Sequence, residues 1–170
     1  HITSGQTAAV LDQMQGAEVV LFSPTASSDQ FTGKDDHFFR VAPATSTQAR
    51  TFARHLVATG VQDVVGVYDL GNRAFAETFW QHLAAEVRSL GGTVRGEVPF
   101  TSGVDDLEAV ARRVAEITPG AIVFVASALD TALLAQYSRQ AGVTVPLLAS
   151  GWAQSDELLA KGGAAIEGMQ

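Results

Sequence analysis

Short apolar runs alternate with longer stretches of helical spacing along most of this chain. The run at residues 121–126 (AIVFVA) is apolar throughout, which is typical of a strand buried on both faces of a sheet. Such strands, separated by helices, form βαβ units around a parallel sheet. We therefore predict an α/β protein with a doubly wound parallel sheet. The predicted strands are residues 18–22, 64–68, 94–100, 121–126, 145–149 and 165–169.

The stretches between the strands have the periodicity of amphipathic helices. From Ala49 onward, apolar side chains recur at i, i+3, i+4, i+7 and i+8, and Gly60 then provides a stop. Near the C-terminus, Ser155 is a candidate cap for a helix whose first turn holds Asp156 and Glu157, as the helix dipole favours. The predicted helices are residues 45–60, 72–90, 107–117, 131–141 and 155–161, and another begins within residues 3–6.

The order of these elements divides the chain unevenly. From residue 44 onward, helices and strands alternate often enough for a five-stranded, Rossmann-like lobe, whereas the first part supplies one helix, one strand and an extended loop. We therefore predict a partial first lobe at residues 1–43 and a second lobe at residues 44–170, in a chain that is a fragment of a larger architecture. Residues 40–44 (RVAPA) are the predicted crossing, because a proline keeps the residue before it extended.

Composition excludes several classes of function. The chain is 46% hydrophobic and 17% charged, as is typical of a folded globular protein. Its net charge of -7 argues against nucleic-acid binding, which needs clustered basic residues. The sequence has no cysteine for a disulfide or a thiolate metal site, and no apolar run approaches the roughly 20 residues that span a bilayer.

Signature motifs of common enzymes are absent from the sequence. It contains no Gly-x-Gly-x-x-Gly fingerprint, phosphate-binding loop, nucleophile elbow or His-Glu-x-x-His zinc helix. We predict no catalytic residue, no metal ion and no cofactor. Residues 35–37 (DDH) could be metal ligands, but one short loop seldom completes a coordination shell, so a solvated turn is favoured. His55 and His82 fall on predicted helices away from strand ends, which favours surface or half-buried roles.

Ligands of doubly wound sheets bind beyond the carboxyl ends of the strands. Residues 23–28 (SPTASS) follow the first predicted strand and bring four hydroxyls and several backbone N–H groups, which suits a small anion such as a carboxylate. Ser4, at the start of the first helix, is a candidate cap whose hydroxyl could meet the same anion. A helix cap beside an ordinary turn explains these residues equally well on physical grounds.

The strand ends of the second lobe carry different chemistry. Residues 68–75 follow one strand and bring an aromatic side chain, an asparagine and charged groups, and residues 150–152 follow another. Trp152 is the best single pocket candidate, because an indole can cover an apolar ligand while its N–H binds a polar end. Packing of Trp152 in the core is an equally good interpretation.

Taken together, the motifs resemble the branched-chain amino-acid-binding proteins and related periplasmic solute-binding proteins of ABC importers. The resemblance covers nearly all of the chain and rests on the order and spacing of several short motifs. These are residues 23–28 (SPTASS), 31–34 (FTGK), 38–41 (FFRV), 67–69 (VYD), 90–92 (LGG), 126–130 (ASALD) and 150–152 (SGW). The resemblance implies a type I periplasmic-binding fold, in which two Rossmann-like lobes joined by hinge strands close on a ligand.

The resemblance also implies a set of ligand-binding residues. In the first lobe, Ser4, Thr25 and Ser27 match positions that hold the carboxylate and ammonium of an amino acid. The second-lobe positions that it places at the cleft are Phe75, Ser127, Ala128, Gly151 and Trp152.

One departure from the family concerns the ligand ammonium. Amino-acid binders of the family place a carboxylate near the position of residues 151–152, where this chain has Gly-Trp. Asp130 could replace that carboxylate from the neighbouring loop. A cap on the helix predicted to start at residue 131 is the favoured interpretation of Asp130.

The expected function is non-catalytic capture of a small carboxylate-bearing solute, an amino acid or related organic acid. The expected partners are this small-molecule ligand and the membrane permease of an ABC importer, in a periplasmic or other extracytoplasmic location. A ligand-sensing ectodomain of a signalling receptor is an alternative that uses the same lobes, and an α/β enzyme is a minor one. The strand at residues 18–22 would have an open edge, which would allow self-association of the fragment.

Overall fold

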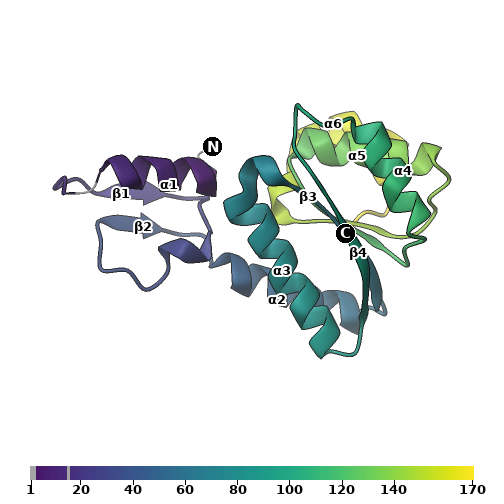
Figure 1. Ribbon diagram of the computed structural model, residues 1–170, viewed down its shortest axis with the longest axis horizontal. Helices are drawn as coiled ribbons and strands as arrows, with labels where there is room; N and C mark the ends of the chain where they lie inside the picture. Colours follow the sequence, from purple (N-terminus) through teal and green to yellow (C-terminus); the bar gives the residue numbers. More distant parts are fainter. Residues whose placement is uncertain (1–2, 15) are drawn as a thin grey trace.

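A computed structural model describes residues 3–14 and 16–170 of the chain. Its helices and strands alternate, with a smaller part on one side and a larger part on the other (Figure 1). The helices are α1 (Ser4–Gln13), α2 (Thr45–Ala58), α3 (Arg73–Ser89), α4 (Leu107–Glu116), α5 (Ala128–Gln140) and α6 (Asp156–Gly162). The strands are β1 (Leu21–Ser23), β2 (Phe38–Arg40), β3 (Asp63–Asp69), β4 (Thr93–Phe100), β5 (Ile122–Val125) and β6 (Leu147–Ala149).

The larger part is built on a four-stranded parallel sheet in the order β4-β3-β5-β6. One face packs against α2 and α3 through a buried cluster that includes Leu56 and Leu83. The other face packs against α4 and α5 through a second cluster that includes Val114 and Leu134. Helices therefore cover both faces, which confirms the predicted doubly wound parallel sheet and explains why residues 122–125 are wholly buried.

A glycine in the central strand lets a tryptophan pack on the sheet. A Cβ atom at Gly66 would overlap the ring of Trp80, so the absence of a side chain there makes room for the indole. Trp80 stacks near Tyr68, with ring centroids 6.4 Å apart, and donates its indole N–H to Glu97. Burial raises the pKa of the Tyr68 phenol above its usual 10.0, and the negative charges of Glu97 and Glu77 raise it further. The phenol is therefore neutral at physiological pH.

The smaller part is a two-stranded parallel sheet with α1 against one face. Ala26, Phe31 and Phe38 form its buried cluster, and the rings of Phe31 and Phe38 meet edge to face at 5.1 Å. The cross-strand neighbours Phe22 and Phe39 point the other way and are 60% and 55% exposed. This sheet is therefore covered on one face only within the described part of the chain.

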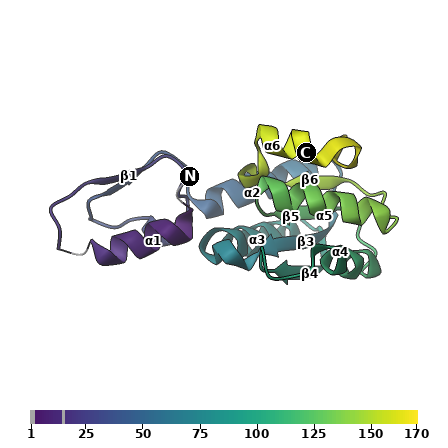
Figure 2. The same ribbon diagram turned by 90° about the horizontal axis from the view of Figure 1, so that it is seen from above.

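The two parts are joined by residues 41–44 and by polar contacts at the start of α2, which leads from the smaller part into the larger (Figure 2). Both carboxylate oxygens of Asp29 bind Ser46, one accepting the backbone N–H at 3.0 Å and the other the hydroxyl at 2.6 Å. The Thr45 N–H donates to the Ser27 carbonyl at 2.8 Å, and the two hydroxyls lie 3.0 Å apart. These bonds fix the loop after β1 against the first turn of α2.

Two sequence predictions about strands are wrong. The segment predicted as a strand at residues 165–169 contains the end of a 3-10 helix, Gly163–Ile166, and then a turn with positive φ at Gly168. Its apolar residues pack against the α4/α5 side of the core, which explains the strand-like composition. Gln170, just after this segment, exchanges backbone hydrogen bonds with β6, but within the described part of the chain residues 165–169 form no strand. The larger sheet therefore has four strands and not the predicted five.

The second error is at the start of the chain. The extended loop of the first part contains a short strand, β2, that pairs with β1. The strand predicted at residues 18–22 is shorter and later, at Leu21–Ser23.

Helix α5 also begins at Ala128, three residues before its predicted start, because Ser127 provides its cap. Among residues 3–14 and 16–170, the helices lack the length and continuous apolar surface that a membrane span requires.

Candidate functional site

A cavity of about 580 Å³ lies where the carboxyl ends of β1, β3, β5 and β6 face one another across the two parts of the molecule. Its wall on the smaller part comes from the start of α1 and the loop after β1. Its wall on the larger part comes from the starts of α3 and α5 and the loop after β6. The structure brings together all eight residues that the sequence predicted at the site, namely Ser4, Thr25, Ser27, Phe75, Ser127, Ala128, Gly151 and Trp152.

Ser4 can act only as a hydrogen-bond donor toward the cavity. Its Oγ accepts the backbone N–H groups of Ser27 and Ser28, each at 3.2 Å. A serine hydroxyl has two lone pairs and one hydrogen, so these two bonds occupy both lone pairs and leave the hydrogen to donate. Ser4 is buried and lines the cavity, and within residues 3–14 and 16–170 no acceptor takes this hydrogen, so it can be donated to an acceptor such as a carboxylate oxygen.

The prediction that Ser4 caps the first helix is wrong. The cap is Thr3, whose Oγ1 accepts the Gln6 N–H at 3.2 Å while the Gln6 side chain accepts the Thr3 N–H at 3.0 Å. This reciprocal capping box satisfies the helix start. Ser4 is the first helical residue. Because Thr3 provides the cap, the Ser4 side chain can bind the loop after β1.

The four hydroxyls of residues 23–28 have different roles. Ser23 Oγ accepts the N–H groups of Thr25 and Ala26, and Ser28 Oγ accepts that of Gln30, so these two serines shape the loop itself. Thr25 and Ser27 line the cavity. The sequence located the hydroxyl-rich loop but could not separate its structural side chains from those at the cavity.

Two aromatic residues form the apolar wall of the larger part. Phe75, in the first turn of α3, meets Trp152 edge to face, with centroids 5.8 Å apart and planes at 88°. Trp152 packs against the α2/α3 side of the core and also lines the cavity, so the two interpretations of this residue are both correct. An apolar ligand body would find here a rigid aromatic surface.

Asp130 is neither the cap of α5 nor a residue that lines the cavity. Ser127 is the cap, and its Oγ accepts the Asp130 N–H at 3.2 Å. The Asp130 Oδ2 accepts hydroxyl hydrogens from Ser127 at 2.7 Å and from Ser102 at 2.8 Å. Asp130 is therefore neither the ligand carboxylate nor the helix cap that the sequence suggested. It lies beside the cavity and accepts a hydrogen bond from Ser127.

Sequence reasoning missed half of the cavity lining. Asn72 and Ser155 were noted only as a strand-end asparagine and a helix cap, although Ser155 makes no side-chain cap bond within the described residues. Among the described residues that line the cavity, Glu157 alone carries a charge. The lining residues not predicted are Thr3, Ala42, Pro43, Gln48, Asn72, Gln154, Ser155 and Glu157. A position directly after a strand or at a helix start was the available signal for most of them.

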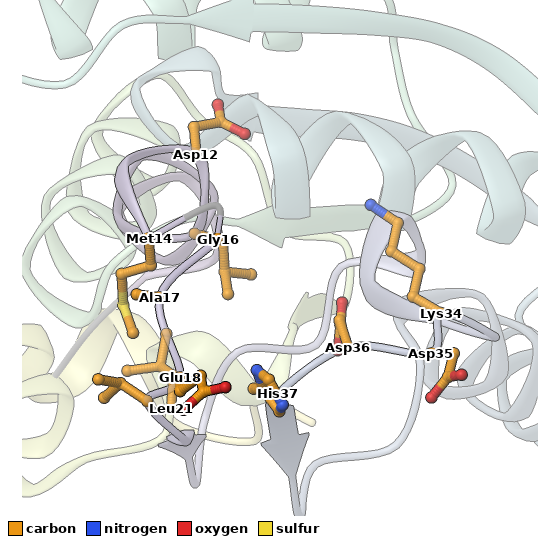
Figure 3. A pocket seen from close by; sticks show the side chains of 12 residues that line it. Asp12, Met14, Gly16, Ala17, Glu18, Leu21, Lys34, Asp35, Asp36 and His37 are labelled. Atoms are coloured by element: carbon orange, nitrogen blue, oxygen red, sulfur yellow. The ribbon is translucent and has the colours of Figure 1, made fainter.

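A second cavity of about 550 Å³ lies at the opposite, amino ends of β1 and β2 (Figure 3). Its side chains come from the end of α1, the segment before β1 and the loop before β2, and they include Asp12, Glu18 and residues 34–37. Asp36 accepts the Phe38 N–H at 3.0 Å and so shapes the turn into β2. No group of three or more acidic or histidine side chains placed to hold a metal ion is found in the described ranges.

Comparison with known families gives one match along the chain. Residues 1–170 match the family described as periplasmic binding protein. The chain belongs to the periplasmic binding protein family. Comparison with curated protein sequences gives no significant match.

Solved structures of periplasmic binding proteins share the fold of this one. A leucine-binding protein, LivK, of Thermotoga maritima is 23% identical, with a TM-score of 0.88 over 98% of this chain and 47% of its own. LivJ of Streptococcus pneumoniae, solved with isoleucine, is 22% identical, with a TM-score of 0.77 over 96% of this chain and 46% of its own.

A third structure has a different kind of ligand. It is a solute-binding protein of an ABC transporter from Rhodopseudomonas palustris, in complex with 4-hydroxybenzoate. This solute-binding protein is 17% identical to the present chain, with a TM-score of 0.82 over 96% of this chain and 45% of its own. The present chain thus spans about half the length of these structures.

Proposed function

We propose that this periplasmic binding protein captures a small carboxylate-bearing solute in the cavity between its two parts, without catalysis. The observation that carries the proposal is the bonding of Ser4, whose Oγ accepts two N–H groups and keeps only a hydrogen for the ligand. This donor faces the cavity from one side, and the Phe75–Trp152 pair borders it from the other. A carboxylate with an apolar body matches both surfaces.

Neutral donors hold the carboxylate in this proposal. Among the described lining residues there is no lysine, arginine or histidine, so the negative charge would be met by the hydroxyls of Ser4 and Ser27, with Thr25 beside them in the lining. Hydrogen bonds from neutral donors stabilise a carboxylate when they are fixed in place before it binds. The bonds that fix Ser4 to the loop and Ser27 to Thr45 supply that fixation.

Binding would close the two parts on the ligand. We assign residues 1–43 to one lobe and 44–170 to the other, with residues 41–44 as the connection that bends. The closed form would be the species recognised by the membrane permease of an ABC importer, on the extracytoplasmic side of the membrane. Relatives solved with isoleucine and with 4-hydroxybenzoate support a ligand in the class of amino acids and aromatic acids.

Calorimetric titration tests this proposal. The panel is leucine, isoleucine, benzoate and 4-hydroxybenzoate, each paired with its carboxamide. We expect at least one acid to bind and its amide to bind at least tenfold more weakly, because the amide lacks the charge that the donors stabilise. Ser27→Ala should weaken binding of that acid by roughly tenfold, the value of about one hydrogen bond to a charged group.

The control is Ser89→Ala, an exposed serine on α3 far along the chain from the cavity residues. It should leave the affinity unchanged. Equal binding of acid and amide, or no loss with Ser27→Ala, would contradict the proposed role of the hydroxyls.

A further inference from the structure

Ser127 differs from Ser4 in what it offers to the cavity. Its hydroxyl hydrogen is donated to Asp130 Oδ2 at 2.7 Å, and one of its lone pairs accepts the Asp130 N–H at 3.2 Å. One lone pair remains. Ser127 lines the cavity and is half-buried, so toward a ligand it can only accept a hydrogen bond.

Neighbouring bonds hold this arrangement in place. Asp130 is buried, and its Oδ2 also accepts the Ser102 hydroxyl at 2.8 Å. The backbone N–H of Ser102 donates to Asp69 at 3.0 Å, and the same Asp69 oxygen accepts the Gly71 N–H at 2.7 Å. These bonds connect the carboxyl ends of β3, β4 and β5. They hold the Asp130 carboxylate, which accepts the Ser127 hydrogen, in a fixed orientation.

Two further polar residues of the larger part lie near Ser127 in the lining of the cavity. Asn72 is buried and lines the cavity, but its Oδ1 is shielded from solvent and has no hydrogen-bond partner within the described part of the chain. Glu157 adds a carboxylate at the exposed end of the lining. The cavity therefore has a donor wall at Ser4 and an acceptor wall around Ser127.

We propose that the site selects a carboxylate whose apolar, aromatic body carries a hydroxyl group, and that Ser127 accepts the hydrogen of that hydroxyl. This inference rests on the proposed function, because it places the ligand carboxylate at Ser4 and Ser27. The Phe75–Trp152 pair borders the ring between the two walls. The Asp130 oxygen beside Ser127 already accepts two hydroxyls, so what Ser127 itself offers is one neutral lone pair, which matches one hydroxyl hydrogen of a ligand.

Matched ligands test the proposal on the unaltered protein. Calorimetry compares 3- and 4-hydroxybenzoate with 3- and 4-fluorobenzoate, because fluorine is close to a hydroxyl in size and cannot donate a hydrogen bond. We expect one hydroxybenzoate to bind roughly tenfold more tightly than its fluoro partner, as one buried hydrogen bond would give. Equal affinities, or tighter binding of both fluoro compounds, would overturn the inference.

Variants locate the effect at Ser127. Ser127→Ala should reduce the hydroxy-to-fluoro affinity ratio toward one, whereas Ser127→Thr, which keeps a hydroxyl and a helix cap, should preserve it. Asp130→Ala should also reduce the ratio, because the Ser127 hydrogen is then free to turn into the cavity. A loss of helix capping alone would weaken both ligands together and leave the ratio unchanged.

The possible failures are distinguishable. If benzoates bind but the ratio is near one, the role of Ser127 is wrong and the proposed capture of carboxylates stands. A ratio that survives Ser127→Ala places the hydroxyl elsewhere and overturns the assignment. If no acid of either panel binds, the proposed function fails and the inference fails with it.

Discussion

The two sheets of this molecule are built from similar residues and have different surroundings. Phe124 in β5 is completely buried because helices cover both faces of the four-stranded sheet, whereas Phe22 in β1 is 60% exposed because α1 covers one face of the two-stranded sheet. Both residues are phenylalanines in short parallel strands. The comparison teaches that an apolar residue in a strand favours burial, but that the elements packed around the strand decide whether it is buried.

The same substitution made in both sheets tests this difference in burial most strongly. Phe124→Ala should lower the free energy of unfolding by about 3–5 kcal/mol, because it removes a fully packed ring and leaves a cavity. Phe22→Ala should change it by no more than about 0.5 kcal/mol, as exposed positions usually do. Urea unfolding followed by circular dichroism measures both, and equal losses would show that the two faces are covered alike.

A second prediction concerns close packing within the larger sheet. Gly66→Ala should cost about 1–3 kcal/mol, because its Cβ would overlap the Trp80 ring and neither the strand nor the indole has room to move. The control is Gly96→Ala on the neighbouring strand, where the Cβ would meet the flexible end of Ile117 at 3.4 Å. Thermal unfolding should separate the two variants, and a stable Gly66→Ala protein would mean that Trp80 packs elsewhere.

The connection between the two parts gives a third, smaller effect. Asp29→Ala removes both bonds to Ser46 at the start of α2 and should destabilise the protein by about 1–2 kcal/mol, as the loss of a helix cap does. Asp35→Ala, in an exposed loop of the same part, serves as the control. Denaturant unfolding distinguishes them, and matching midpoints for the two variants would exclude a capping role for Asp29.

The smallest change in stability is expected for Phe22→Ser, which should instead affect association. The exposed Phe22–Phe39 pair is an apolar surface on a short sheet, and such surfaces promote contact between molecules. We expect sedimentation to show less concentration-dependent association for Phe22→Ser than for the unaltered protein. Identical sedimentation would show that this face does not mediate self-association.

The sequence was most informative where residues act locally. Continuous apolarity at residues 121–126 and helical spacing from Ala49 identified the layers, because these patterns depend only on which side of an element is buried. The same reasoning misread residues 165–169, whose apolar side chains pack on the core from a 3-10 helix and a turn. Composition alone cannot distinguish these two ways of burying an apolar residue.

The candidate site shows the same limit. Strand-end reasoning and the family resemblance brought eight of its residues to the cavity, but Asn72 and Glu157 were missed, because their approach to Ser4 depends on how distant elements pack. The donor role of Ser4 and the acceptor role of Ser127 could not be predicted either. Each role is fixed by partners that lie elsewhere in space, namely two backbone N–H groups for Ser4 and the carboxylate of Asp130 for Ser127.

A crystal structure of the protein with a bound benzoate or hydroxybenzoate is the most direct test of this division between a donor wall and an acceptor wall. We predict that the carboxylate oxygens lie within hydrogen-bonding distance of the Ser4 and Ser27 hydroxyls, with the ring against Phe75 and Trp152. A carboxylate bound instead at Ser127 and Asn72, or a ligand outside this cavity, would contradict the proposed site.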